Sequence, residues 1–168
     1  MAEHRTIAVK AEALTVEGWA PFGQIPVDET EPVDPVHLEF KLADPHCNFI
    51  FHSYDEVRRS PGGGPLCDHL NRHDTATQTL MPMNCDAVIV VAPASVDFSS
   101  TQHLDTVRAF LLRRYEICNL SIGTWHWGPF PIAPGQVRLL NMQGKGFPND
   151  NLVARLDEGL GTLVEVAT

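Results

Sequence analysis

Prolines and glycines interrupt this chain too often for long helices: 13 prolines and 12 glycines are spread over 168 residues. Between them lie short runs of β-branched or alternating apolar residues, which are typical of strands. The runs are CNFIFHSY (47–54), TQTLMPM (77–83), AVIVVAP (87–93), VRAFLL (107–112), NLSIGTW (119–125) and QVRLLNM (136–142). Strands at this spacing predict a mostly β sandwich or barrel.

Two segments have other features. TVRAFLLRR (106–114) fits two helical turns, but its apolar residues also alternate as in a strand. KAEALTVEGWAPF (10–22) allows a short helix that Gly18 and Pro21 would end. We find no internal repeat and no segment that resembles an interdomain linker, so we expect residues 1–168 to form a single domain.

Composition restricts the partners and the compartment. The apolar fraction of 43% is that of a globular protein, and the net charge of −9 argues against nucleic acid or an anionic membrane as a partner. A small anionic substrate stays compatible, because a few local cations can override the global charge. The first residues lack the pattern of a signal peptide, and the four cysteines form no Cys-x-x-Cys pair. We therefore expect a cytoplasmic protein with reduced thiols.

The first polar cluster is RHDTATQTLMP (72–82), where hydrogen-bonding side chains lead directly into a strand. His73 and Gln78 are five residues apart, so on one regular strand they would face opposite sides. A turn at residues 74–76 would bring both inward to a site. Alternatively, Asp74 and Thr75 form a polar surface turn and His73 is exposed. Both interpretations are open at this point.

The second cluster is SIGTWHWGPFP (121–131), in which His126 lies between Trp125 and Trp127. An imidazole in an apolar wall is held in its neutral form, which suits a general base or a metal ligand. We favour that function, because tryptophans line pockets as readily as cores. The alternative is an aromatic core in which His126 bonds a backbone carbonyl.

Other polar residues give weaker signals. Lys145 lies between two glycines and would expose its ammonium either at a cavity mouth or in an ordinary surface turn. His52 lies within an apolar run and could face either side of a strand. We interpret the remaining histidines as surface residues; these are His4, His37, His46, His69 and His103.

Together the two clusters resemble the paired motifs of a cupin, and more closely those of the ureidoglycolate lyase family. The segments that carry this resemblance cover roughly residues 13–145. They are LTVEGWAPFGQI, RHDTATQTLMP, the VIVVAP strand, the RAF strand and the GTWH turn, in that order. The resemblance implies a cupin-like double-stranded β-barrel of the jelly-roll type, with short terminal helices.

The resemblance also implies an activity: a carbon–nitrogen lyase of the amidine-lyase type, cleaving ureidoglycolate to glyoxylate and urea in purine and allantoin catabolism. The catalytic candidates are His126, as the base, with His73 to relay the proton or bind the carboxylate, and Gln78 to orient the ureido group. The substrate-binding candidates are Arg72, Thr75, Trp125 and Lys145. The small anionic substrate would be ureidoglycolate or a related ureido acid, and the assembly a homodimer.

The chain departs from the usual cupin pattern at its metal-ligand positions. Thr75 stands where a second histidine is common, and Gln78 replaces a carboxylate. Two imidazoles and an amide bind divalent metals poorly, so we expect no required cofactor. A weakly bound metal, if present, would use His73, Gln78 and His126 as ligands. A non-catalytic ligand-binding cupin and a metal-dependent cupin isomerase or oxygenase are the alternative functions.

Overall fold

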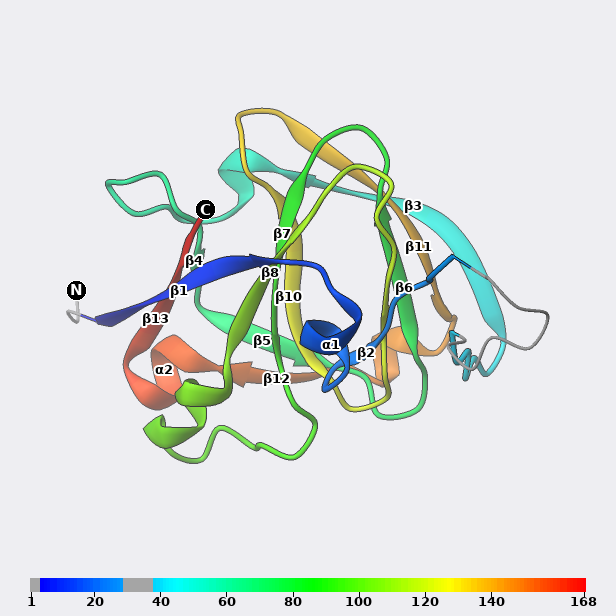
Figure 1. Ribbon diagram of the computed structural model, residues 1–168. Coiled ribbons are helices and arrows are strands. Elements are labelled where there is room, and N and C mark those ends of the chain that lie inside the picture. Colours follow the sequence, from blue (N-terminus) through cyan, green and yellow to red (C-terminus); the bar gives the residue numbers. More distant parts are fainter. Residues whose placement is uncertain (1–3, 29–37) are drawn as a thin grey trace.

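The computed structural model describes residues 4–28 and 38–168. Of the described residues, 47% are in strands and 13% in helices, and the strands form two sheets, of which the larger curls into a half-barrel (Figure 1). This confirms the predicted mostly β, cupin-like barrel. The helices are short: α1 (Val16–Trp19), α2 (Leu156–Leu160) and the 3₁₀ segments η1 (Tyr54–Glu56), η2 (Thr101–Thr106) and η3 (Phe147–Asn149).

The larger sheet has eight strands in the order β12-β5-β10-β7-β8-β1-β13-β4. Its strands are β1 (Arg5–Ala13), β4 (Leu66–Cys67), β5 (His69–Arg72), β7 (Ala87–Ala92), β8 (Arg108–Leu112), β10 (Trp125–Pro131), β12 (Leu152–Arg155) and β13 (Thr162–Ala167). Strand β1 pairs in parallel with both β8 and β13, so it joins the N-terminal and C-terminal segments of the chain.

The smaller sheet has five strands in the order β2-β9-β6-β11-β3. Its strands are β2 (Gly23–Gln24), β3 (Pro45–Ser53), β6 (Gln78–Pro82), β9 (Cys118–Leu120) and β11 (Gln136–Gly144). The long antiparallel pair β3–β11 lies side by side at one edge of this sheet (Figure 1).

Strand β7 separates two hydrophobic cores, which explains its continuous apolar sequence AVIVVA. Val88 and Val90 face one core, here called the outer core, where they meet side chains of β10 and β13 in the same curled sheet and of α2. Ile89 and Val91 face the barrel interior, where they meet side chains of β6, β8 and β9. Because side chains alternate along a strand, every residue of β7 is buried.

One end of the barrel interior is filled by aromatic rings. The Thr15 hydroxyl accepts a hydrogen bond from the Gly18 N–H and caps α1. Helix α1 then delivers Trp19 onto Phe110, with the ring centroids 5.2 Å apart in an edge-to-face arrangement. Phe22 packs on both rings. None of these three rings lines the cavity that is described below.

All six predicted runs contain strands, and 106–114 contains strand β8 rather than a helix. NLSIGTW is not one strand but the end of β9, a turn, and the first residue of β10. The helix expected over 10–22 is limited to four residues, because β1 continues to Ala13. Strand β1 was not predicted, because much of its length is exposed and its pattern is only weakly apolar. Among the described residues, no helix is long and apolar enough to span a membrane.

Arg59 ties the segment that follows β3 to the barrel. Its guanidinium donates to three carbonyl oxygens, those of Tyr54, Gly63 and Pro131, at 3.0–3.1 Å. It also stacks on the Tyr54 ring, 3.3 Å from the centroid. The Arg59 side chain therefore links the segment 54–66 to β10.

We expect Arg59→Ala to loosen this segment without unfolding the barrel, because the bonds it removes are confined to residues 54–66 and Pro131. Hydrogen exchange at the amides of Ser60, Gly63 and Leu66, which bond within the segment, should accelerate at least tenfold. The exposed Arg113→Ala is the control. Unchanged exchange in Arg59→Ala would show that the segment is held by other contacts.

Candidate active site

A cavity of about 500 Å³ opens into the barrel between the two sheets. Its walls come from β3, β5, β6, β10 and β11, and from the segment tied by Arg59. Its polar lining includes His52, Arg58, His69, His73, Gln78 and His126. The cavity therefore joins both sequence clusters with residues from a third segment, which no sequence motif had indicated.

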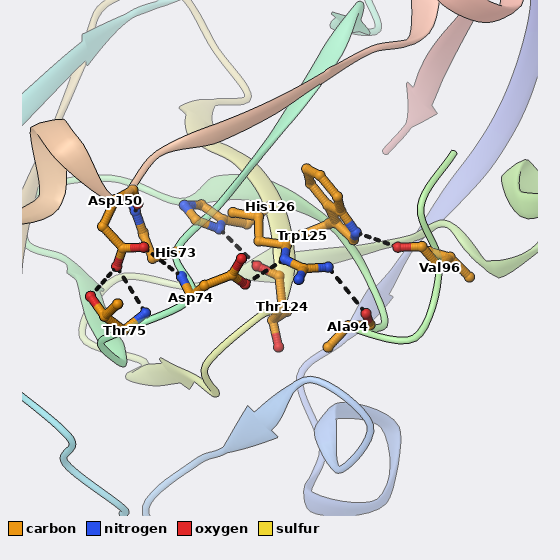
Figure 2. Close-up of polar contacts among 10 residues, drawn as sticks. His73, Asp74, Thr75, Ala94, Val96, Thr124, Trp125, His126 and Asp150 are labelled. Atoms are coloured by element: carbon orange, nitrogen blue, oxygen red, sulfur yellow. Dashed lines mark hydrogen bonds and ion pairs between the residues drawn. The ribbon is translucent and has the colours of Figure 1, made fainter. Parts of the chain in front are cut away.

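Strand β10 points His126 into the barrel. His126 pairs with Val91 of β7 and Asn71 of β5, and Val91 is an inward-facing residue. Trp125 and Trp127 alternate to the outer face and join the outer core, where the Trp125 indole N–H donates to the Val96 carbonyl at 2.8 Å. Figure 2 shows Trp125 on the Val96 side and His126 near His73. The tryptophans thus do not enclose His126 as the sequence suggested, although Trp127 also contributes to the cavity wall.

His126 is held in one neutral form. Its Nδ1 lies 3.2 Å from the Thr124 carbonyl, which can only accept, so Nδ1 carries the proton and Nε2 carries a lone pair. Burial, and then the neighbouring His73 imidazole, lower the pKa of His126 to about 4, while the Thr124 carbonyl acts in the opposite direction. The ring is therefore neutral at pH 7, as expected. The cause is burial in the barrel interior and the neighbouring imidazole of His73, and not a wall formed by the two tryptophans.

His73 lies in the turn between β5 and β6, and its ring centroid is 5.3 Å from that of His126. Its Nδ1 donates to the Asp150 carbonyl, which leaves Nε2 unengaged by that bond. The Gly123 N–H donates to the His73 carbonyl at 2.7 Å, so the two sequence clusters touch through their backbones. Gly123 has a φ of +81°, and an added Cβ would lie 3.0 Å from Ala94 Cβ. Glycine therefore suits this position in GTWH.

Asp150 organises the turn that carries His73. Its carboxylate accepts from the backbone N–H groups of Asp74 and Thr75, at 2.8 and 2.9 Å, and from the Thr75 hydroxyl (Figure 2). Burial tends to raise the pKa of Asp150, but the Thr75 hydroxyl, the two N–H groups and the charge of His73 lower it overall. Sequence reasoning missed Asp150, because NDN after a proline looks like an ordinary surface turn.

A chain of three amides leads from Gln78 to the cavity mouth. Gln78 Nε2 donates to Asn141 Oδ1, and Asn141 Nδ2 donates to Asn48 Oδ1, each at 2.8 Å. Asn141 is fully buried and Asn48 is exposed on β3. The chain fixes the Gln78 amide, so its Oε1 is directed away from Asn141.

Charged groups line another part of the cavity. The His69 Nδ1 lies 2.6 Å from Asp68 Oδ1, and Arg58 lies 3.6 Å from the same carboxylate. The hydrogen bond from His69 is the main cause that lowers the pKa of Asp68. The interpretation of His69 as a surface residue was wrong: it is half-buried and lines the cavity, because β5 turns it to the same face as Asn71.

The four predicted binding residues lie outside this cavity. Arg72 binds Asp74 at 2.6 Å and the Ala94 carbonyl, with its guanidinium 5.2 Å from the Trp125 ring. Thr75 is bonded to Asp150, and Lys145 is exposed beside Asp44. Trp125 fills the outer core. The structure gives these side chains contacts that stabilise the surroundings of His73 and His126, and does not bring them to the cavity lining.

The ligand set suits a divalent metal poorly. His73, His126 and Gln78 offer two imidazoles and an amide, and the amide is already bonded to Asn141. Among residues 4–28 and 38–168, no three His, Cys, Asp or Glu side chains are grouped so that they could hold a metal ion.

The barrel, with paired imidazoles and an amide in a polar cavity, is cupin-like. The sequence profile of ureidoglycolate lyase matches residues 43–157, well over half of the chain, and this protein belongs to the ureidoglycolate lyase family. A comparison with curated proteins found no match. Membership supports a lyase that acts on a small ureido compound in purine degradation.

The depressed pKa of His126 predicts a loss of stability in weak acid. Unfolded histidine titrates near pH 6.5, so between pH 6.5 and about 4 the unfolded chain binds a proton that folded His126 does not. The contribution of His126 to the free energy of unfolding is fully present above this window and is lost as the pH falls through it. The loss is about 2 kcal/mol between pH 7 and pH 5.

Guanidinium denaturation of the wild type and His126→Gln at both pH values measures this contribution. The variant should lose about 2 kcal/mol less than the wild type between pH 7 and pH 5. An equal loss in both proteins would mean that His126 binds its proton over the same pH range in the folded and unfolded states.

Proposed function

We propose that this protein cleaves ureidoglycolate to glyoxylate and urea. The observation that carries the proposal is the pair His73–His126, with ring centroids 5.3 Å apart and each Nδ1 engaged by a backbone carbonyl. Both Nε2 atoms are thereby available to a molecule in the cavity. The family match supports the same reaction class.

The reaction needs one base and one acid. In ureidoglycolate a single carbon bears a hydroxyl, a carboxylate and the ureido nitrogen. Removing the hydroxyl proton lets the oxygen form the carbonyl of glyoxylate while the carbon–nitrogen bond breaks. The departing nitrogen takes up a proton and leaves as urea. Proton transfer of this kind by a positioned side chain contributes roughly 10²–10⁴ in rate.

We assign the base to His126 and the acid to His73. Neutral His126 accepts the hydroxyl proton on Nε2, because its low pKa keeps the ring unprotonated. His73, which is partly exposed and lies near the charged carboxylate of Asp150, donates the proton that the leaving nitrogen receives. Two imidazoles this close do not both carry a positive charge, because like charges at this distance repel. The pair therefore holds a single proton, so that one ring is the acid and the other is the base.

We assign the substrate carboxylate to Arg58, in place of Arg72 and Lys145. Arg58 lines the cavity and is half-exposed. Its two ion pairs are long, at 3.6 Å to Asp68 and 3.9 Å to Asp157, which leaves the guanidinium free to bind a further anion. The charged lining that the sequence did not identify thereby supplies the anion site.

Turnover of ureidoglycolate with glyoxylate as the readout tests the proposal. His126→Asn should lower kcat about 10²-fold or more with little change in KM, whereas His73→Asn should also raise KM. His103→Asn, which alters a histidine outside the cavity, is the matched control. A folded His126→Asn enzyme with near-normal kcat would remove His126 as the base, and a wild type without turnover would favour a ligand-binding cupin.

We also propose that the reaction requires no metal. The support is the weak donor set of His73, Gln78 and His126 and the tie between Gln78 and Asn141. Chelator-treated enzyme should keep its full turnover. Activity that is lost on chelation and restored by a divalent ion would instead favour a metal-dependent cupin.

We also propose that the protein is located in the cytoplasm. The support is its four free cysteines, because reduced thiols are typical of that compartment.

We further propose a homodimer that pairs through the outer face of β3. This strand is an edge of the small sheet, and Phe49 and Phe51 are 44% and 50% exposed on its outer face. The Arg138 guanidinium stacks on Phe49, 3.7 Å from the ring centroid, as aromatic and arginine side chains do at interfaces.

Sedimentation should show a dimer at micromolar concentration for the wild type and a monomer for Phe51→Glu, which places a charge in the apolar contact. Tyr115→Glu, which alters another exposed aromatic residue, should stay dimeric. A monomeric wild type would contradict the proposed assembly and leave the catalytic assignment untouched.

A further inference from the structure

We propose that Gln78 and Gln143 form the recognition site for the ureido end of the ligand, and that they select it by accepting its N–H groups. The proposal rests on the proposed function for the identity of the ligand. It adds a residue, Gln143, that neither the motifs nor the catalytic assignment includes. It also fixes which end of the ligand lies beside the two imidazoles.

The two glutamines lie next to each other on the inner face of the small sheet. Strands β6 and β11 pair Thr79 with Met142 and Leu80 with Asn141, and extending this register by one residue sets Gln78 opposite Gln143. Both line the cavity. Directly opposite side chains in an antiparallel pair start about 5 Å apart, so one small group can reach both amides.

Both amides have a buried oxygen without a donor. Gln78 is 8% exposed and Gln143 is 6% exposed, and neither Oε1 accepts a hydrogen bond from any described residue. A buried amide oxygen without a partner costs free energy, typically more than a made hydrogen bond contributes. Such atoms in a cavity wall indicate a ligand that supplies the missing donors.

The amide chain sets the polarity of the Gln78 side. Asn141 Nδ2 is committed to Asn48 Oδ1, so Asn141 presents its oxygen to Gln78. Gln78 must then give its Nε2 to Asn141, and only its Oε1 remains for the cavity. Gln78 is thereby an acceptor toward the ligand, although an amide can in general act either way.

The imidazole of His126 adds an acceptor to the same part of the cavity. With its Nδ1 donating to the Thr124 carbonyl, the neutral ring offers only an Nε2 lone pair. The region around Gln78, Gln143 and His126 therefore presents mainly acceptors. A carboxylate would be repelled there, whereas a ureido group brings three N–H donors and a carbonyl.

The orientation of the ligand follows. Its ureido end lies against the two glutamines, its hydroxyl lies beside the imidazoles, and its carboxylate points toward Arg58. On β5, Asn71 pairs with His126, and His69 lies two residues before Asn71, about 7 Å away along the strand. Asp68, which bonds His69, and its neighbour Arg58 therefore lie roughly 7 Å or more from His126 along the barrel. A molecule of the length of ureidoglycolate can extend from one region to the other.

A pair of ligands that are not cleaved tests this recognition. N-Carbamoylglycine and N-acetylglycine share a carboxylate and one N–H, and differ by NH₂ against CH₃. Binding is measured by titration calorimetry, or by protein NMR shifts where the affinities are millimolar. The wild type should prefer N-carbamoylglycine at least about tenfold, since about 1.4 kcal/mol corresponds to that ratio.

The variants assign the preference to the glutamines. Gln143→Met removes an acceptor from a side chain that makes no hydrogen bond among the described residues, and the preference should fall to about threefold or less. Gln78→Met should reduce it likewise. Gln136→Met, at the exposed start of the same strand, should keep it in full.

Equal affinities in the wild type, or an undiminished preference in both cavity variants, would overturn the proposal. These outcomes are separable from the proposed function. Turnover of ureidoglycolate together with equal affinities would leave the lyase assignment and remove the recognition site. A strong preference that depends on the glutamines, in a protein without turnover, would keep the recognition site and remove the lyase assignment.

Discussion

The alternation of side chains along the paired strands β7 and β10 is the constraint on which the site depends. One face of this pair is a tightly packed core with Val88, Val90 and Trp125. The other face carries Ile89, Val91 and, on β10, His126. Because a strand has a period of two, a shift of register by one residue would place the imidazole in the outer core and an indole in the cavity. The outer tryptophans thereby hold His126 in register.

The polar cavity has an energetic cost that the rest of the barrel offsets. His126 is buried as a neutral base, and the amide oxygens of Gln78 and Gln143 lack donors. Each feature opposes folding by itself. The aromatic filling at the other end, around Trp19 and Phe110, and the doubly buried β7 supply the compensating apolar burial. Groups that are poorly satisfied in the free protein are those that a ligand can engage with the greatest gain.

Much of the fold could be predicted from local patterns, and part of the site could be too. The apolar runs that became β3, β7 and β11 were recognisable, because strands of this kind depend on side chains near in sequence. His73, Gln78 and His126 were recognisable because they lie in motifs. The short polar strand β5 and the exposed β1 were not, since their pairing partners are distant in the chain and only the sheet stabilises them.

The sequence by itself determined the β class, the two motifs and the residue types available for proton transfer. Only the tertiary structure decided which of these side chains meet. It directed Trp125 away from His126 and paired Arg72 and Lys145 with neighbouring carboxylates. It also brought Arg58, His69 and Gln143 to the cavity wall. The physical reason is that inward or outward direction depends on register and twist between strands remote in the chain, which no local pattern encodes.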